Sequence, residues 1–244
     1  MNDSTTRFGA RAGDYALYRP SYPRDAIAAV LDGFPTPDVA DVGAGTGISS
    51  IALANAGAYV FAVEPNANMR GSIPVRADIA VVDGTAEATS LPAHSVDIVA
   101  AFQAYHWFTP DRVLAEAARI GRARVRFAAV WNERDEKDPF VREYSAIIQR
   151  YITDDTEARR RNTTVDDDLR AQGWQHVRLL EFRHVVPVDW EALIGRTRST
   201  SYLPREGPAY DAMAVELRAL FDRASEFGGA RFALVTSVHL GERQ

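Results

Sequence analysis

The 244-residue sequence contains no cysteine, which excludes disulfide bonds, cysteine-ligated metal sites and cysteine nucleophiles. Lysine is almost missing too: Lys137 is its single occurrence, and arginine supplies the rest of the basic charge. The five histidines do not show the spacing of a metal-binding motif. We therefore expect a protein without a metal site.

Long apolar runs are also missing. No run approaches the ~20 apolar residues that a membrane-spanning helix requires. The first residues, Met-Asn-Asp-Ser-Thr-Thr-Arg, are polar and precede no apolar segment, unlike a secretory signal. These two features predict a cytoplasmic protein that does not contact a membrane.

An excess of basic charge is missing as well, because 28 basic and 33 acidic side chains give a formal net charge of −5. The chain as a whole is thus not expected to bind nucleic acid. Arginines gather at residues 159–161 and between residues 119 and 126, which leaves a local basic patch open. The simpler interpretation is solvated charge beside acidic and apolar neighbours.

Apolar runs that read as strands alternate with helical patterns through the first 135 residues. This alternation predicts a doubly wound α/β fold, whose parallel sheet is covered by helices on both faces. The length and the apolar fraction of 46% fit one domain over residues 1–244. The expected strands are 39–43, 59–63, 79–82, 96–102, 125–131, 176–186 and 230–238, and the expected helices are 24–31, 48–56, 67–70, 110–120, 140–151, 165–171, 190–197 and 210–224.

A glycine-rich turn, Gly43-Ala-Gly-Thr-Gly47, follows the first expected strand and leads into a helix. Such a unit binds nucleotides, because glycine lets the backbone approach a ligand closely. The common dinucleotide fingerprint needs a glycine at its sixth position, where this chain has Ile48. Asp41 stands two residues before the turn and would repel a pyrophosphate. Both features suit a ligand without phosphates, and S-adenosylmethionine, with its sulfonium and ammonium groups, is one.

The second expected strand ends at Glu64, roughly twenty residues beyond the glycine turn. A carboxylate at this place can accept hydrogen bonds from both hydroxyls of a ribose. An isolated glutamate at a strand end would be an ordinary surface charge. Its distance from the glycine turn favours ribose binding here.

Four segments together resemble the class I S-adenosylmethionine-dependent methyltransferases: 39–47, 63–69, 83–92 and 103–108. They correspond to the first motif, the second motif, the adenine-binding loop and the segment after strand four. The last of these, and the segment 14–23, resemble a type 11 subgroup that includes trans-aconitate methyltransferase-like proteins. The likeness covers residues 1–135 in the expected order, and the final third matches only loosely.

The resemblance implies a Rossmann-like, seven-stranded sheet of order 3-2-1-4-5-7-6 with the last strand antiparallel. It also implies that residues 1–23 form a lid arm and that residues 135–205 form an insert shaping the acceptor pocket. The cofactor that the resemblance implies is S-adenosylmethionine, which becomes S-adenosylhomocysteine after methyl transfer. The implied cofactor-binding residues are Tyr15, Arg19, Asp41, Gly43, Ala44, Gly45, Gly47, Glu64, Pro65, Met69, Asp83, Thr85, Ala86 and Gln103.

Two positions depart from the pattern of that family. Many relatives carry an aspartate where Thr85 stands, which accepts from the adenine amino group. Thr85 can accept only through its hydroxyl, and Asp83, two residues earlier, is the alternative acceptor. The usual Pro-Gly-Gly turn before strand five is replaced by the shorter segment 119–124, which affects a connection and not the cofactor site.

Methyl transfer from a sulfonium is an in-line displacement that depends on positioning. A carboxylate acceptor needs no base, whereas a hydroxyl or an amine does. His106 follows the fourth expected strand at the carboxyl edge of the sheet and is the candidate base, with packing beside Trp107 as the alternative.

Several further side chains are candidates for binding the acceptor. Tyr105, Trp107 and Phe108 would wall its pocket or belong to the core, and Tyr22 would belong to a lid or to a simple N-terminal clasp. Arginines 196 and 198, with Tyr202, would face an anionic substrate such as a carboxylic acid methylated at oxygen. The substrate-binding residues predicted from the sequence are Tyr22, Tyr105, His106, Trp107 and Arg198.

The sequence thus favours a monomeric or homodimeric enzyme that methylates a small molecule at a carboxylate or hydroxyl oxygen. A nicotinamide-dependent oxidoreductase is disfavoured by the glycine spacing and by Asp41. An RNA methyltransferase is disfavoured by the acidic charge balance. A non-catalytic module that binds S-adenosylmethionine stays open, because intact cofactor motifs do not distinguish it from an enzyme.

Overall fold

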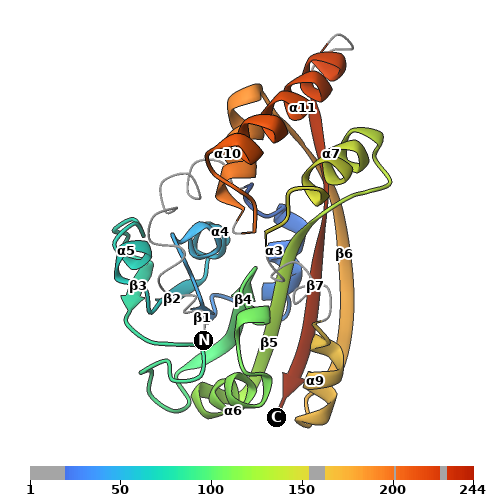
Figure 1. Ribbon diagram of the computed structural model, residues 1–244. Coiled ribbons are helices and arrows are strands. Elements are labelled where there is room, and N and C mark those ends of the chain that lie inside the picture. Colours follow the sequence, from blue (N-terminus) through green and yellow to red (C-terminus); the bar gives the residue numbers. More distant parts are fainter. Residues whose placement is uncertain (1–19, 154–162, 201, 226–229) are drawn as a thin grey trace.

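The computed structural model describes residues 20–153, 163–200, 202–225 and 230–244. Within them, a seven-stranded sheet has the order β3-β2-β1-β4-β5-β7-β6 (Figure 1). Strand β7 is antiparallel to both β5 and β6, and the other pairs are parallel. The strand order and direction predicted from the sequence are confirmed. The strands are β1 (Asp38–Val42), β2 (Tyr59–Val63), β3 (Ile79–Val82), β4 (Val96–Phe102), β5 (Gly121–Arg134), β6 (Gln175–Pro187) and β7 (Arg231–Arg243).

Helices cover both faces of the sheet because the strands are apolar on both sides. Val39 packs in the cluster that includes α3 and α4, whereas Ala40, the next residue of β1, packs in the cluster that includes α6 and α9. None of the described helices is both long and apolar enough to cross a lipid bilayer. The helices are α3 (Arg24–Leu31), α4 (Ile48–Asn55), α5 (Ala67–Arg70), α6 (Pro110–Ile120), α7 (Pro139–Gln149), α9 (Val165–Ala171), α10 (Trp190–Ser199) and α11 (Pro208–Ser225), with a 3₁₀ turn η1 (Tyr105–Trp107).

Strands β1 and β4 lie side by side at the centre of the sheet, where the strand order changes direction. Ligands of doubly wound folds bind at this place, beyond the carboxyl ends of the strands. The glycine turn follows β1, Glu64 follows β2 and Gln103 follows β4. Parallel pairing of Val42 with Val63 brings the ends of β1 and β2 to the same level. The topology therefore brings three predicted cofactor segments to one edge.

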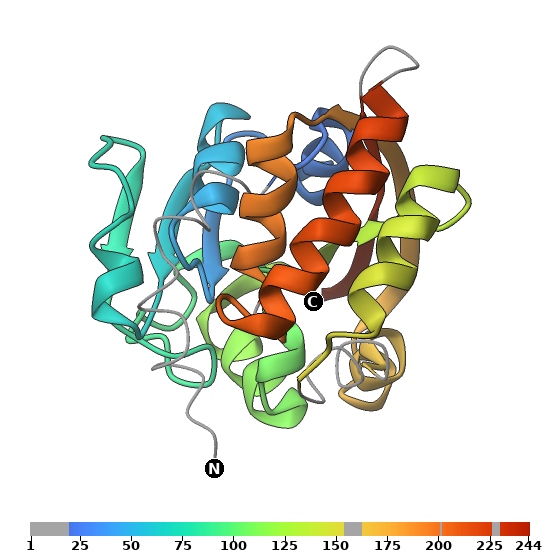
Figure 2. The same ribbon diagram turned by 45° about the horizontal axis from the view of Figure 1, so that its top comes forward.

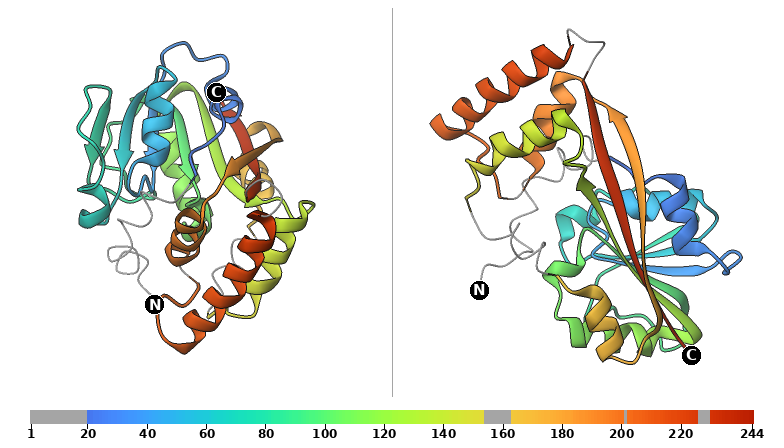
Figure 3. Two further views of the ribbon diagram at one scale, coloured as in Figure 1. Left: turned by 90° about the horizontal axis from the view of Figure 1, so that it is seen from above. Right: turned by 90° about the vertical axis from the view of Figure 1, so that its right-hand side faces the viewer.

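A group of three helices, α7, α10 and α11, gathers at one end of the long strands β5, β6 and β7 (Figures 2 and 3). Tyr144 of α7, Leu193 of α10 and Leu217 of α11 are buried there together with Phe232 of β7. Among the described residues of the segment 135–205, which was expected to form one insert, α7 and α10 join this group, β6 is a strand of the sheet, and α9 packs against β6 and β7. Residues 1–19 of the expected lid arm lie outside the described residues.

The arginines between residues 119 and 126 are not free solvated charges. Arg122 pairs with Asp38 and Asp97, and Arg124 pairs with Glu242. Arg126 is buried, donates to the carbonyl oxygens of Val30 and Asp32, and pairs with Glu242. The interpretation as solvated charge was wrong for Arg126, because alternate residues of β5 point into the layer beneath α3. These partners neutralise the cluster that a basic patch would require.

Candidate active site

A cavity opens where β1, β2 and β4 end. Residues from the glycine turn, from the end of β2, from the loop after β3 and from the end of β4 line it together. Two predicted cofactor residues, Tyr15 and Arg19, lie outside the described residues. The predicted cofactor residues that line the cavity are Gly43, Ala44, Gly45, Glu64, Pro65, Met69, Thr85, Ala86 and Gln103.

The glycine turn needs glycine for two physical reasons. Gly43 and Gly45 have φ angles of 71° and 58°, in the left-handed region that side chains disfavour. A Cβ atom at Gly43 would lie 2.9 Å from the Cβ of Ala104, so the turn packs directly against the segment after β4. Gly47, at φ 85°, precedes the first residue of α4 and does not line the cavity. Its observed place is the start of α4, and its contact with a cofactor stays a prediction.

Glu64 presents a fixed carboxylate at the cavity wall. Its Oε2 accepts from the Gly45 amide and its Oε1 from the Asn66 amide, both at 2.9 Å. Burial raises the pKa of Glu64, and the two amides and the charge of Arg70 oppose that rise. An ionised carboxylate has about four acceptor positions, so two remain for the hydroxyls of a ligand. The geometry matches a bidentate acceptor for a ribose.

Asp41 lies behind the wall and not in it. Its side chain is fully buried, and its Oδ2 accepts from the hydroxyls of Ser49 at 2.7 Å and Ser50 at 2.6 Å. Burial raises the pKa of Asp41 to about 6, against the opposing effect of the two serine hydroxyls. No described protein group bonds to its Oδ1. Ser49 lines the cavity, so Asp41 acts on a ligand through Ser49 and through its charge.

The loop after β3 presents Thr85, Ala86 and Glu87 to the cavity. The Thr85 hydroxyl already accepts from the Ala88 amide at 3.1 Å, which leaves it one lone pair for a ligand. Asp83 is exposed, pairs with Arg70 at 3.0 Å and lies outside the wall. The expectation that Asp83 substitutes for Thr85 is therefore not supported by its placement.

Glu87, which nothing in the sequence singled out, is the carboxylate that this loop brings to the wall. Its Oε1 accepts from the Thr109 amide at 3.0 Å. This bond ties the loop to the residue that precedes α6. The sequence gives little indication of this role, because a single acidic residue in a polar loop is usually a solvent-exposed charge.

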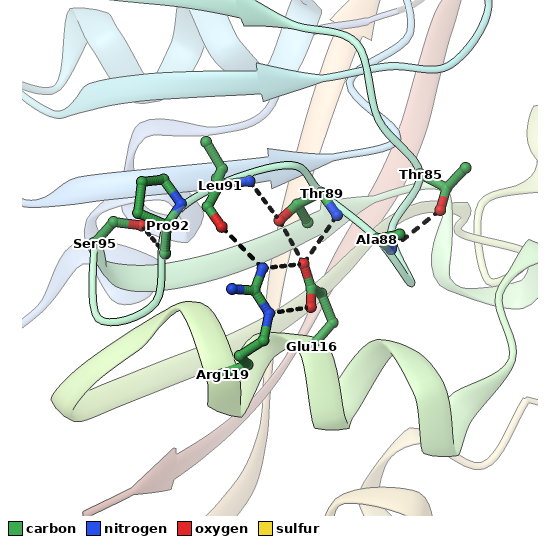
Figure 4. A network of polar contacts seen from close by, with 8 residues as sticks. All are labelled: Thr85, Ala88, Thr89, Leu91, Pro92, Ser95, Glu116 and Arg119. Carbon is green, nitrogen blue, oxygen red and sulfur yellow. Dashed lines mark hydrogen bonds and ion pairs between the residues drawn. The ribbon is translucent and has the colours of Figure 1, made fainter.

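A second set of bonds fastens the same loop to α6 (Figure 4). The Oε1 of Glu116 accepts from the Thr89 amide at 2.9 Å and from the Thr89 hydroxyl at 2.6 Å. Arg119 donates to both oxygens of Glu116 at 2.7 Å and to the Leu91 carbonyl at 2.8 Å. Arg119 holds the pKa of Glu116 down at about 2, assisted by Thr89. The network fixes the backbone that leads from Thr85 to Leu91.

The segment after β4 connects the cavity to β5. Gln103 has a φ of 57°, an uncommon conformation for a residue other than glycine. Its Nε2 donates to the Asn132 carbonyl at 3.2 Å. The Asn132 side chain lines the cavity, donates to the Pro20 carbonyl at 3.4 Å and accepts from the Thr236 hydroxyl at 2.6 Å. Nothing in the sequence pointed to Asn132, because it lies inside a strand.

Beyond the cofactor motifs, aromatic side chains and one cation line the cavity. Tyr22, Trp107 and Phe108 were predicted there and line the cavity. Phe102, at 4.7 Å between ring centroids from Tyr22, joins them. Arg196 of α10 is the cation, and its side chain is 9% exposed. Its guanidinium lies 4.2 Å from the ring centroid of Phe232.

Three side chains predicted to touch the substrate lie elsewhere. His106 is not in the wall: its Nδ1 accepts weakly from the Trp131 indole at 3.5 Å, and its ring lies 4.9 Å from that of Trp107. Tyr105 is a core residue that donates to Asp168 at 3.1 Å. The rings of His106 and Tyr105 thus pack against neighbouring aromatic rings, and a role of His106 as the base stays a prediction.

Arg198 is the third of these side chains. It is exposed, and its guanidinium lies 5.5 Å from the ring centroid of Tyr210, outside the cavity. Tyr202 is buried and accepts from Arg134 at 3.2 Å. Of these candidates for binding an anion, Arg196 is the one that lines the cavity.

Known proteins are similar to this chain in sequence and in fold. Residues 40–129 match the family described as a methyltransferase domain. An uncharacterized methyltransferase of Mycobacterium tuberculosis is 41% identical over 152 residues, which cover 61% of each chain. An uncharacterized methyltransferase-like protein of Schizosaccharomyces pombe is 30% identical over 154 residues. The aligned part thus spans about three fifths of the length of these relatives.

A solved structure, described as a putative type II methyltransferase from Anaeromyxobacter dehalogenans, is 25% identical in sequence and has a TM-score of 0.67. The likeness covers 93% of this chain and 98% of that one. Residues 40–129 thus match a methyltransferase domain, and the chain has a fold like that of this solved structure. The narrower likeness to trans-aconitate methyltransferase-like proteins stays a prediction.

The cavity fits the cofactor of class I methyltransferases. Glu64 has lone pairs for the two ribose hydroxyls, and Gly43 and Gly45 remove the Cβ atoms that would fill the space beside them. The buried charge of Asp41, with its open Oδ1, favours a ligand that carries positive charge. The acids around the turn disfavour a phosphate-bearing nucleotide at the same place.

Proposed function

We propose that this protein is an S-adenosylmethionine-dependent methyltransferase that transfers a methyl group to a small-molecule acceptor, at a carboxylate or hydroxyl oxygen. The observation that carries the proposal is the Glu64 carboxylate, held by the amides of Gly45 and Asn66 at the edge of a cavity. Backbone amides fix both oxygens, so the acceptor geometry exists before a ligand binds.

The residues of the cavity position and shield the reactants. Glu64 would accept from the ribose, Met69 and Ala86 would contact the adenine, and Gln103 would lie near the methionine moiety. S-adenosylmethionine, when bound, supplies a methyl group on a positively charged sulfur. Tyr22 and Trp107 would exclude water from the acceptor side. Holding the acceptor in line is the main contribution that such a site makes to the rate.

A small acceptor is favoured over RNA by the charge of the described surface. The arginines between residues 119 and 126 each have carboxylate partners, as shown above, so they do not form an open basic patch. RNA binding gains most of its affinity from such patches and weakens steeply with salt. A filter-binding assay at two salt concentrations checks this point, and tight, salt-dependent RNA binding would favour the alternative.

Isothermal titration of S-adenosylhomocysteine, S-adenosylmethionine and NADH tests the cofactor assignment. We expect both adenosyl compounds to bind and NADH not to bind. In Glu64→Gln, an amide N–H₂ faces a backbone amide and the charge is lost, so the affinity should fall about 100-fold, the equivalent of about 3 kcal/mol. Glu181→Gln is the matched control: it makes the same exchange of a carboxylate for an amide at an exposed position on β6, and it should bind as the wild type does. Equal affinity in the wild type and Glu64→Gln would refute the ribose assignment.

A further inference from the structure

Arg196 supplies the one cationic side chain among the described residues of the cavity wall. It is largely buried, so water and salt screen its charge much less than they screen a surface arginine. A guanidinium carries five N–H donors in a fixed fork and can bind a protein group and a ligand at once. The wall therefore has a built cationic position.

This position is structurally separate from the cofactor segments. The residues proposed to hold S-adenosylmethionine follow β1, β2, β3 and β4, whereas Arg196 comes from α10 in the group formed by α7, α10 and α11. Its guanidinium packs on Phe232 of β7, which fixes its direction from the side of that helical group. The cation thus reaches the cavity from an element that supplies none of the proposed cofactor contacts.

The proton acceptors of the wall also limit the chemistry. Glu64 is held by two amides at the ribose position, and Glu87 is bound to the Thr109 amide in the loop after β3. His106 is outside the wall. Among the described lining residues, Glu64 and Glu87 are the carboxylates, both come from the cofactor segments, and both are already bound to backbone amides. An acceptor that reacts without losing a proton fits this arrangement best.

We propose that Arg196 binds the carboxylate of the acceptor, and that the acceptor is a small carboxylic acid with an apolar body, methylated on oxygen. This inference rests on the proposed function and narrows its acceptor class. Tyr22, Phe102 and Trp107 form the apolar surface for that body. Arg196 holds one carboxylate oxygen by hydrogen bonds and leaves the other oxygen to attack.

The reaction balances without a base. One C–O bond forms to the acceptor, the donor C–S bond breaks, and its electron pair stays on the sulfur. The carboxylate becomes a neutral ester and the sulfonium a neutral thioether, so no proton is moved. The ester has lost the charge that Arg196 binds, which favours release of the product.

Saturation-transfer NMR with S-adenosylhomocysteine bound tests the proposal on the full chain. Phenylacetate is the probe, and phenylacetamide and methyl phenylacetate are its neutral counterparts. We expect the wild type to bind phenylacetate at least tenfold more tightly than either neutral compound. Arg196→Met should abolish this preference, Arg196→Lys should retain part of it, and Arg198→Met, on the exposed side of the same helix, should leave it unchanged.

The outcomes separate the two proposals. No binding of S-adenosylhomocysteine by folded wild type would overturn the proposed function itself. Normal binding of S-adenosylhomocysteine, with no preference of the wild type for the acid over the amide, would overturn only the role of Arg196. Loss of S-adenosylhomocysteine affinity in a folded Arg196→Met protein would assign Arg196 to the cofactor and overturn its role in acceptor binding. The comparison of acid and amide in the wild type needs no variant, so a misfolded Arg196→Met does not prevent the test.

Discussion

Replacing Glu116 by glutamine tests whether the network on α6 holds the adenine loop in place. Glutamine keeps an oxygen for the Thr89 amide but removes the charge that pairs with Arg119. The loop that leads from Thr85 to Thr89 would then be anchored mainly by neutral hydrogen bonds. Both the stability of the fold and the affinity for S-adenosylhomocysteine should fall.

The magnitude follows from the pKa of Glu116. Its depression from 4.5 to about 2 corresponds to at most about 3 kcal/mol of stabilisation of the charged form. Arg119 is 45% exposed, so solvent screening reduces this value to about 2 kcal/mol. For a chain of this size the loss corresponds to a fall in Tm of about 4–8 °C.

The contribution of the pair between Glu116 and Arg119 to the free energy of unfolding should depend on pH. Because the folded pKa of Glu116 is depressed, the pair stabilises the fold above a pH of about 4.5, and this contribution is lost as the pH falls toward 2. The difference in unfolding free energy between the wild type and Glu116→Gln should therefore be constant from about pH 5.5 to 8 and should shrink below about pH 4.5. Urea denaturation at several pH values measures it.

A control and a binding measurement complete the test. Arg170→Gln removes an exposed pair with Asp167 and should cost about 0.5 kcal/mol or less. The affinity of Glu116→Gln for S-adenosylhomocysteine should fall about threefold to tenfold, the equivalent of about 1 kcal/mol. A Glu116→Gln protein with unchanged Tm, or one whose loss of stability persists at pH 3, would refute the reasoning.

Two further substitutions probe the glycine turn in the cavity wall and the buried acid behind it. Gly43→Ala places a Cβ 2.9 Å from the Cβ of Ala104 at a φ of 71°, so calorimetric titration should show the affinity for S-adenosylhomocysteine reduced more than tenfold. Gly57→Ala is the control: Gly57 also has a positive φ, but its Cβ would meet open space, so this variant should lose only stability. Equal binding by both variants would contradict the packing role of Gly43. Burial raises the pKa of Asp41 from 3.8 to about 6, so the fold loses about 3 kcal/mol in total as the pH rises from about 3 to about 7. Denaturation at several pH values should show this slope removed in Asp41→Asn, and a slope that persists would place its origin in other groups.

The sequence by itself determined the local units and their order. Strands β2, β3 and β4 and helices α3, α5, α6 and α9 have the predicted bounds. The reason is local: apolar runs, the glycine turn and helix stop signals act over a few residues. The predicted bounds are further from the observed ones where pairing with distant strands extends a strand. Strand β7, for example, continues to Arg243 because it is hydrogen-bonded to β5 on one side and to β6 on the other.

Only the tertiary structure decided which neighbours face the cavity. Arg196 and Arg198 are two residues apart, so they point about 200° apart around α10. The burial of Leu193 and Thr197 fixes the rotation of that helix and turns Arg196 inward. In the same way, the 3₁₀ turn after β4 sends Tyr105 into the core and Trp107 into the cavity wall. Composition and spacing identify such residues as candidates, but the packing of distant segments selects among them.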